Sequence, residues 1–230
     1  MNCQRDHDDR RHRNGAASFL PNPAGAGKLE DDDDDLSSRQ FFAVFRNRVL
    51  LPWYAIIVIN MFLVGILFGF LPVYVHSLGY NQLVNGLIIG SATVSYLLVQ
   101  PFAGRLAGRV DPMKVILAGL VLSAAGVALV AFTRGGWLVA VVVAGGLGVG
   151  TVWTNSDAAV SHFAAKGQIG STLGAAGSFK ELGDMVGPLL IGILADSLGL
   201  TAAFVTCGLL GALALPLVRL AGLRSTIDSS

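Results

Sequence analysis

Six apolar segments of about twenty residues each restrict what this chain can fold into more than any other feature of its sequence. A helix needs about 20 predominantly apolar residues to cross the hydrocarbon core of a bilayer. The segments are too long for strands and lack the alternation of an outer-membrane barrel. We therefore predict an all-α membrane protein with six transmembrane helices, joined by short links that favour antiparallel neighbours. The segments are Leu51–Val75, Gln82–Ala103, Val115–Phe132, Trp137–Ser156, Ser171–Ala195 and Ala202–Leu220.

The composition agrees with this prediction and excludes several other classes of protein. Hydrophobic residues make up 53% of the 230 residues and charged residues only 13%, about half the charged fraction of a soluble domain. The net charge of +1 gives no indication of a nucleic-acid partner. Cys3 and Cys207 lie far apart, and neither has a second Cys or His at the spacing of a metal site. We expect no structural disulfide, no metal site, no cofactor and no soluble enzyme.

The first fifty residues carry dense charge ahead of the apolar segments. They hold eight of the sixteen Lys and Arg residues and nine of the fifteen Asp and Glu residues, including the run Asp31–Asp35. So polar a segment buries too little apolar surface to fold. We therefore predict that residues 1–38 form a disordered acidic cytoplasmic tail. The aspartate run is interpreted as a solvated tract rather than a calcium site, because it contains no turn residues.

Residues 39–50 show a different pattern from this tail. Phe41, Phe45 and Val49 recur at helical spacing, whereas Arg46 lies on another face. This pattern is typical of an amphipathic helix at the membrane interface, with arginine near anionic headgroups. The alternative is a simple extension of the first transmembrane helix.

Positive residues near the helix ends predict the orientation, because cytoplasmic loops are enriched in Lys and Arg. Nine such residues lie on one side of the predicted bundle, and Arg134 alone lies on the other. We therefore expect both termini in the cytoplasm, a bundle over residues 51–222 and a cytoplasmic C-terminal tail over residues 223–230. The nine residues are Arg39, Arg46, Arg48, Arg105, Arg109, Lys114, Lys166, Arg219 and Arg224.

The link between the second and third segments carries a family resemblance. Its sequence, GRLAGRVDPMK from Gly104 to Lys114, resembles the cytoplasmic loop signature of the major facilitator superfamily. The acidic residue of that signature falls on Gly108 here, and its second glycine falls on Asp111. In the family, the acidic residue pairs with a neighbouring helix and helps to lock one conformation, a role in which Asp111 is the candidate substitute. The resemblance implies a conformational-switch loop made of Gly104, Leu106, Ala107, Arg109 and Asp111.

The fifth segment carries a second match, to the antiporter signature of the same superfamily. Ile191 stands where that signature has its penultimate glycine. Glycines on a membrane helix let another helix approach closely, and proline permits a bend. We therefore interpret this set as a helix-packing signature. Its members are Gly174, Gly183, Gly187, Pro188 and Gly192.

The resemblance covers the membrane portion of the chain but only half of a superfamily transporter, which usually has twelve helices in two six-helix halves. The fourth segment lacks the arginine that N-terminal halves often carry, and the acidic tail resembles the linker that precedes the C-terminal half. These features favour the C-terminal half. The antiporter signature is usually described on the fifth helix of the first half, which keeps an N-terminal half as the alternative.

Three charged residues, Lys180, Glu181 and Asp184, lie near the middle of the fifth segment. Charged groups inside a membrane are costly and are a functional hypothesis by default. Lys180 and Asp184 are four residues apart and can pair along one helix face. Three interpretations remain open: Glu181 or Asp184 carries a proton during transport, the charges form a structural pair, or they recognise a charged solute.

Weaker candidates for the wall of a substrate cavity are polar residues in other segments, where an interhelical hydrogen bond is the commoner explanation. The glycine run over residues 145–150 lies beside some of them and predicts close helix packing. It is no nucleotide fingerprint, because no strand precedes it. The substrate-cavity candidates are Asn60, Gln100, Thr151 and Asn155, with Thr154 and Asp157 on the same part of the fourth segment.

The resemblance implies secondary active transport of a small solute by a multi-pass protein of the plasma membrane. Alternating access is the expected mechanism, and proton-coupled efflux by an antiporter is the finer hypothesis. One half cannot enclose a cavity, so we expect a homodimer or a partner half, surrounded by membrane lipid. The alternative is a truncated or accessory membrane protein without transport activity of its own. An enzyme is not indicated, because neither a Gly-x-Ser-x-Gly nor a His-Glu-x-x-His sequence occurs.

Overall fold

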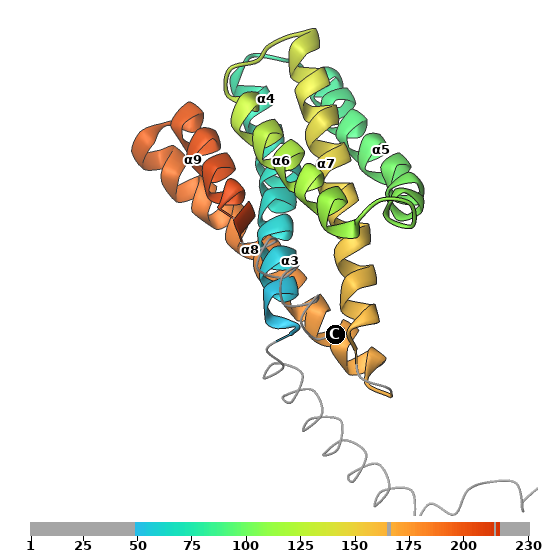
Figure 1. Cartoon of the computed structure of the whole chain (residues 1–230). Helices are drawn as coiled ribbons and strands as arrows, with labels where there is room; N and C mark the ends of the chain where they lie inside the picture. The colour runs from blue at the N-terminus through green and yellow to red at the C-terminus, as the bar shows by residue number, and fades with distance from the viewer. Residues whose placement is uncertain (1–48, 165–166, 214, 217–230) are drawn as a thin grey trace, which may run out of the picture. The chain divides into compact units, whose positions relative to one another are not determined.

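Every regular element in the described part of the chain is a helix (Figure 1). The computed structural model describes residues 49–164, 167–213 and 215–216. α3, η2 and α4 follow one another without a break, so within these residues six helical rods fall on the six predicted segments. The elements are α3 (Leu51–Val64), the π-helix η2 (Gly65–Phe70), α4 (Leu71–Ser77), α5 (Gln82–Ala107), α6 (Pro112–Val130), α7 (Gly136–His162), α8 (Ile169–Leu198) and α9 (Leu200–Ala212).

Some of the predictions fall outside these residues. The acidic tail over residues 1–38, most of the interfacial helix over residues 39–50 and the C-terminal tail over residues 223–230 are among them. The last two residues of the predicted interfacial helix, Val49 and Leu50, form a turn.

Four of the described rods are long and apolar enough to cross a membrane, which makes the chain a multi-pass membrane protein. They are the rod Leu51–Ser77 and the helices α5, α6 and α7. α8 has 30 residues but is interrupted by charged side chains, and α9 has only 13 residues. By length and composition alone, neither of these two is identified as a span.

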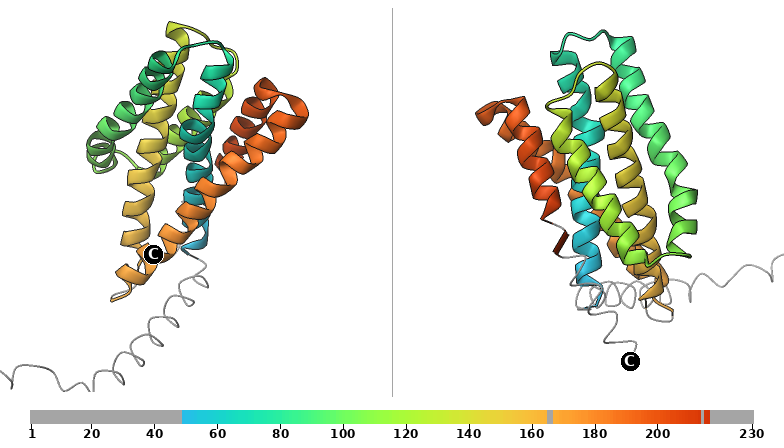
Figure 2. Two further views of the ribbon diagram at one scale, coloured as in Figure 1. Left: turned by 180° about the vertical axis from the view of Figure 1, so that it is seen from behind. Right: turned by 45° about the horizontal axis from the view of Figure 1, so that its top comes forward.

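Capping residues and glycines set where the rods begin and end. The side chain of Asn81 accepts a hydrogen bond from the backbone N–H of Val84 and starts α5, and Asp111 does the same for Met113 and α6. Gly199 alone separates α8 from α9, with a φ of 84° that favours glycine. The rods consequently run alternately up and down (Figure 2).

α7 lies against both α5 and α6, and its glycine run over residues 145–150 brings the three backbones close together. A Cβ added at Gly146 would lie 2.5 Å from the carbonyl oxygen of Ala92 on α5. One added at Gly148 would lie 2.5 Å from the backbone nitrogen of Ser123 on α6. The run thus works as the packing element that its sequence predicts.

α8 packs on the rod of α3 and η2 through glycines from both sides. A Cβ at Gly187 of α8 would lie 2.5 Å from the carbonyl oxygen of Phe62. In return, a Cβ at Gly65 of η2 would lie 2.9 Å from Cδ of Pro188. This double set of small residues fixes the register between the two rods.

The bundle therefore consists of two groups that share the central rod of α3, η2 and α4. α5, α6 and α7 lie on one side of it, and α8 and α9 lie on the other (Figure 1). α8 touches α7 only sparingly, whereas α9 returns to pack on α6. Ile66, Leu67 and Leu71 of the central rod are fully buried.

Gly187→Ala is expected to lower the free energy of unfolding by about 1–3 kcal/mol, because the added methyl group meets the Phe62 backbone. Gly174→Ala is the matched control in the same helix, since no described atom lies within 4 Å of its added Cβ. It should be neutral or gain up to about 1 kcal/mol from helix propensity. Thermal unfolding in detergent, followed with a dye that reacts with the buried thiol of Cys207 in a Cys3→Ser background, compares the two variants. Equal midpoints of thermal unfolding for the two variants would contradict the close packing of Gly187 against Phe62.

Candidate functional site

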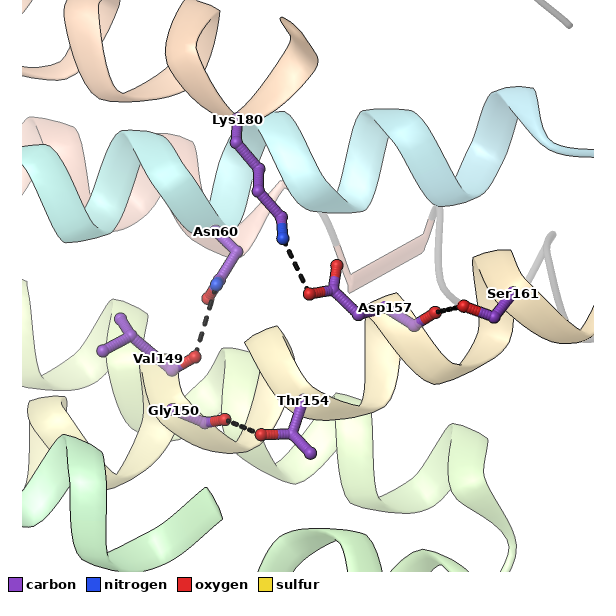
Figure 3. A network of polar contacts seen from close by, with 7 residues as sticks. All are labelled: Asn60, Val149, Gly150, Thr154, Asp157, Ser161 and Lys180. Carbon is purple, nitrogen blue, oxygen red and sulfur yellow. Dashed lines mark hydrogen bonds and ion pairs between the residues drawn. The ribbon is translucent and has the colours of Figure 1, made fainter. Parts of the chain in front are cut away.

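An ion pair joins α8 to α7 across the central rod (Figure 3). The Nζ atom of Lys180 lies 2.7 Å from Oδ2 of Asp157, and the two side chains are 19% and 30% exposed. The sequence spacing allows Lys180 to pair with Asp184 along α8, whereas in the structure the ion-pair partner of Lys180 is Asp157. The physical reason is the packing of α8 on α3, which brings the long lysine side chain within reach of a carboxylate on α7. The carboxylate of Asp184 lies instead beside Gly65 of η2.

An aromatic ring forms part of the same site. The Lys180 ammonium lies 4.5 Å from the centroid of the Trp153 ring, a cation–π distance. Trp153 and Asp157 are four residues apart on α7 and therefore present ring and carboxylate to one cation. Tyr96 of α5 meets the Trp153 ring edge-on at 5.8 Å. Gln100, a predicted cavity residue, stands one turn after Tyr96 on α5.

The pair borders a recess whose wall contains polar atoms without partners. The recess has no room for a water molecule in this conformation. Among the described side chains, Oδ1 of Asn60, Oγ of Ser156 and Oδ1 of Asp157 are buried and accept no hydrogen bond. Each such buried, unpaired group costs about 1–3 kcal/mol. The recess is lined by Ile57, Asn60, Met61, Trp153, Ser156, Asp157 and Lys180.

Asn60 is the predicted cavity residue that the structure does bring to this recess. Its side chain is only 3% exposed. Its Nδ2 donates a hydrogen bond to the carbonyl oxygen of Val149, at 3.3 Å, which holds α3 to α7 (Figure 3). The amide oxygen is left without a partner and belongs to the recess.

Other predicted cavity residues bond to their own helix instead. The hydroxyl of Thr151 donates to the carbonyl oxygen of Leu147 at 2.8 Å, and Nδ2 of Asn155 donates to the carbonyl oxygen of Thr151 at 2.8 Å. The hydroxyl of Thr154 donates to the carbonyl oxygen of Gly150. Such bonds satisfy a polar side chain within one helix, and none of these three residues lines the recess.

Glu181 and Asp184 are exposed on α8, outside the recess. Lys180 lies about 16 Å along α8 from the start of that helix at Ile169, at about 1.5 Å per residue. A charged side chain within the hydrocarbon core of a bilayer is too costly to face lipid. Among the described residues, no group of His, Cys, Asp or Glu is placed to hold a metal ion.

The predicted switch loop joins α5 to α6. α5 ends at Ala107, and Gly104, Leu106 and Arg109 are exposed. The carboxylate of Asp111 accepts a hydrogen bond from the backbone N–H of Met113 at 3.0 Å and so caps α6. Within the described residues, no ion pair ties this loop to a neighbouring helix.

The predicted packing signature on α8 divides into two parts. Gly183, Gly187 and Pro188 lie in the interface with α3 and η2. Gly192 has only ordinary van der Waals contact, to the ring of Phe70, and Gly174 has no described atom near its side. The close approach thus occupies the middle of α8.

Comparison with known proteins now decides the family. The model of the Major Facilitator Superfamily matches residues 53–229, which is more than half of the chain. The chain belongs to the major facilitator superfamily. The resemblance seen in the loop and in the fifth segment is therefore confirmed.

Relatives within the superfamily include proteins named as exporters. A multi-drug resistance efflux pump PmrA homolog of Lactococcus lactis is 30% identical over 181 residues, covering 74% of this chain and 43% of the relative. The uncharacterized transporter YuxJ of Bacillus subtilis is 32% identical, covering 59% of this chain and 36% of the relative. The staphylopine export protein of Staphylococcus aureus is 32% identical over 69 residues, covering 30% and 17%. The chain spans less than half the length of each of these superfamily members.

Two residues of the site, Trp153 and Ser156, were not singled out by sequence reasoning, whereas Asp157 was named among the weaker cavity candidates. A signal for Trp153 was present, since it stands one helical turn before Asp157 in the fourth predicted segment. Ser156 carries no such signal, because a serine bonded within its own helix is far commoner.

The ion pair should show a measurable coupling energy. Asp157→Ala and Lys180→Ala are each expected to lower the free energy of unfolding by about 1–3 kcal/mol, because each leaves a half-buried charge unpaired. The double variant should cost about 0.5–3 kcal/mol less than the sum of the two single variants. Thermal unfolding of the four proteins in one detergent measures this cycle.

The matched control for the cycle is Glu181→Ala combined with Asp157→Ala. Glu181 is exposed on the same helix and has no ion-pair partner among the described residues. The changes in the free energy of unfolding caused by Glu181→Ala and by Asp157→Ala should add in the double variant to within about 0.5 kcal/mol. If the free-energy changes of Lys180→Ala and Asp157→Ala add equally well, the two residues do not interact and the ion pair is contradicted.

Proposed function

We propose that this chain forms one six-helix bundle of a secondary transporter that exports a small solute by alternating access. The observation that carries the proposal is the group of charges on α7 and α8: the Asp157–Lys180 pair, with Glu181 and Asp184 exposed beside it. Such charges inside a membrane protein mark a solute or ion pathway. Membership of the superfamily and the exporter names of two relatives support the same function.

The charged side chains of α8 also explain why hydropathy alone does not identify this helix as a span. A helix that lines a water-filled path carries polar groups on one side and needs lipid contact only on the other. α9 is followed in the sequence by further apolar residues, and the sixth predicted segment, Ala202–Leu220, has about the length of a span. We propose six transmembrane helices with both termini in the cytoplasm of a cell whose plasma membrane holds the protein. The excess of Lys and Arg on one side supports this orientation.

A second bundle completes the transporter in this proposal. Superfamily transporters enclose the solute between two six-helix halves that rock about a central site. Glu181 and Asp184 lie on a face that must be covered by water or protein, and that face suits the wall shared with the second half. Either a second copy of this chain or another polypeptide segment supplies that half. Asp111 is proposed to act in the switch loop between the two access states.

Protons are proposed as the coupling ion, with Glu181 or Asp184 as the group that binds them. The charged groups nearest to these carboxylates along α7 and α8 are Lys180 and Asp157. α3 contributes the titratable Tyr54 and no charged side chain, η2 contributes neither kind of group, and α9 contributes Cys207. A carboxylate with a lysine within one turn can bind a proton and release it as the cavity changes sides.

An alternative function has one specific observation in its favour. Gly108 replaces the acidic residue of the superfamily loop, and no described ion pair compensates for it. A chain without that lock fits an accessory membrane protein that packs against a partner and transports nothing itself. The experiment below separates the two functions.

Glu181→Gln or Asp184→Asn is expected to abolish solute-dependent proton movement in proteoliposomes that hold the assembled protein. The reason is that an amide keeps the shape of the side chain but cannot take up a proton. Asp196→Asn is the matched control, because Asp196 is exposed near the end of the same helix. A panel of solutes, an imposed pH gradient and a pH-sensitive dye inside the vesicles supply the readout.

The oligomeric state is measured on the same preparation by native mass spectrometry from lipid nanodiscs. A dimer with proton-coupled flux supports the homodimeric transporter. Flux that persists unchanged in both carboxylate variants would contradict their role in coupling. A protein without solute movement in any assembled state would favour the accessory function.

A further inference from the structure

We infer that the Lys180 ammonium occupies a binding site for a primary organic ammonium ion, and that a solute carrying such a group displaces it. The inference deepens the proposed function and rests on it, because it names a class of solute for the face formed by α7 and α8.

Two groups around the ammonium of Lys180 are those that a protein uses to bind a cation. The carboxylate of Asp157 lies 2.7 Å from Nζ, and the ring of Trp153 lies 4.5 Å from it. A carboxylate supplies charge, and an aromatic face supplies the attraction of its π electrons. Both belong to α7, whereas the cation comes from α8. The site and the group that fills it therefore sit on different helices.

Three further oxygen atoms favour a cation with N–H donors. Oδ1 of Asn60, Oγ of Ser156 and Oδ1 of Asp157 are buried in the wall of the recess and have no hydrogen-bond partner. Asn60 is 3% exposed and Ser156 is 1% exposed, so bulk water does not satisfy them. A primary ammonium has three N–H donors, whereas a quaternary ammonium has none. An anion would add a further acceptor to a wall that already has an excess of acceptors.

Lys180, whose ammonium group is attached to α8 through its side chain, does not supply hydrogen bonds to all of these oxygen atoms. Its ammonium makes one hydrogen bond with a side chain, to Oδ2 of Asp157, because its stem reaches the recess from α8 and fixes where Nζ can lie. A free ammonium on a small solute has no such constraint. The apolar side chains of Ile57 and Met61, which line the same recess, would contact the aliphatic part of that solute. The partial exposure of Lys180 and Asp157 lets an entering molecule reach the ion pair itself, and withdrawal of the Lys180 side chain then vacates the space that its ammonium fills.

The displaced lysine has an alternative partner one turn away. Asp184 stands four residues after Lys180 on α8, is exposed, and has no ion-pair or hydrogen-bond partner among the described residues. Oppositely charged side chains at this spacing can pair on a helix surface. Binding then exchanges one ion pair for two: the solute takes Asp157, and Lys180 moves to Asp184. After the exchange, Asp157, Lys180 and Asp184 are all paired.

The test is equilibrium binding followed by Trp153 fluorescence in nanodiscs at pH 7. The chain has three tryptophans, so Trp53→Phe and Trp137→Phe leave Trp153 as the single reporter. The probes are butylammonium, N,N,N-trimethylbutylammonium and butyrate. Butylammonium should bind saturably and about tenfold more tightly than the trimethylated probe, which lacks the N–H donors. Butyrate should not bind.

Three variants separate the tethered-cation model from a purely structural pair. Lys180→Met removes the internal competitor and should tighten butylammonium binding by about tenfold or more, because the site is no longer occupied. Lys180→Gln is expected to act in the same direction. Asp157→Asn should weaken binding by about tenfold or more. A misfolded variant cannot gain affinity, so a tighter Lys180 variant is not explained by structural damage.

Asp184→Asn tests the exchange of partners. It should weaken butylammonium binding when Lys180 is present and leave the affinity unchanged in the Lys180→Met background. Binding of butyrate that depends on Lys180, or absence of butylammonium binding in both Lys180 variants, would overturn the inference. Because the assay needs no flux, amine binding without transport refutes the proposed function alone. Solute flux by a protein that binds no amine refutes the inference alone.

Discussion

Close approach of helix backbones is the constraint on which this structure depends, because in lipid the hydrophobic effect does not pull helices together. The chain allows this close approach through glycines at the helix contacts. They are the run over residues 145–150 on α7, and Gly187 of α8 opposite Phe62 of α3. These contacts leave little freedom in register. Every polar contact between rods follows from that register, including the reach of Lys180 across the central rod to α7.

The ion pair connects the two groups of helices at a place where they otherwise have few contacts. α8 packs on the central rod and touches α7 only sparingly, so a charged pair at their edge is a local interaction and not part of the continuous core. Its partial exposure keeps it reversible, since exposed pairs contribute less than buried ones. The unpaired oxygens beside it show that the surrounding wall is not satisfied by this chain alone in this conformation.

Much of the fold could be predicted from the sequence, but the centre of the candidate site could not. Segment length places all six rods, and Asp111 before Pro112 indicates where α6 begins. Helical spacing relates only the residues of one helix, so it points to Asp184 as a possible partner of Lys180 and does not show that Asp157 of α7 lies within reach. The choice of Asp157 over Asp184 depends on the rotation of α8 against α3, which glycine contacts set. Asn60 could be found as a polar residue in an apolar helix, whereas Ser156 shows no such contrast.

The π-helical segment between α3 and α4 has a consequence for how the central rod presents its two ends. A π turn contains more residues than an α turn. The six residues Gly65–Phe70 therefore change the direction in which the side chains of α4 point, compared with a continuous α-helix. The face that carries Asn60 toward α7 is therefore not continued at the other end of the rod. There Tyr74 turns to donate to the carbonyl oxygen of Ala131 and to pack on Phe204 of α9. One rod thereby serves two different neighbours, with a change of phase and no break in the helix.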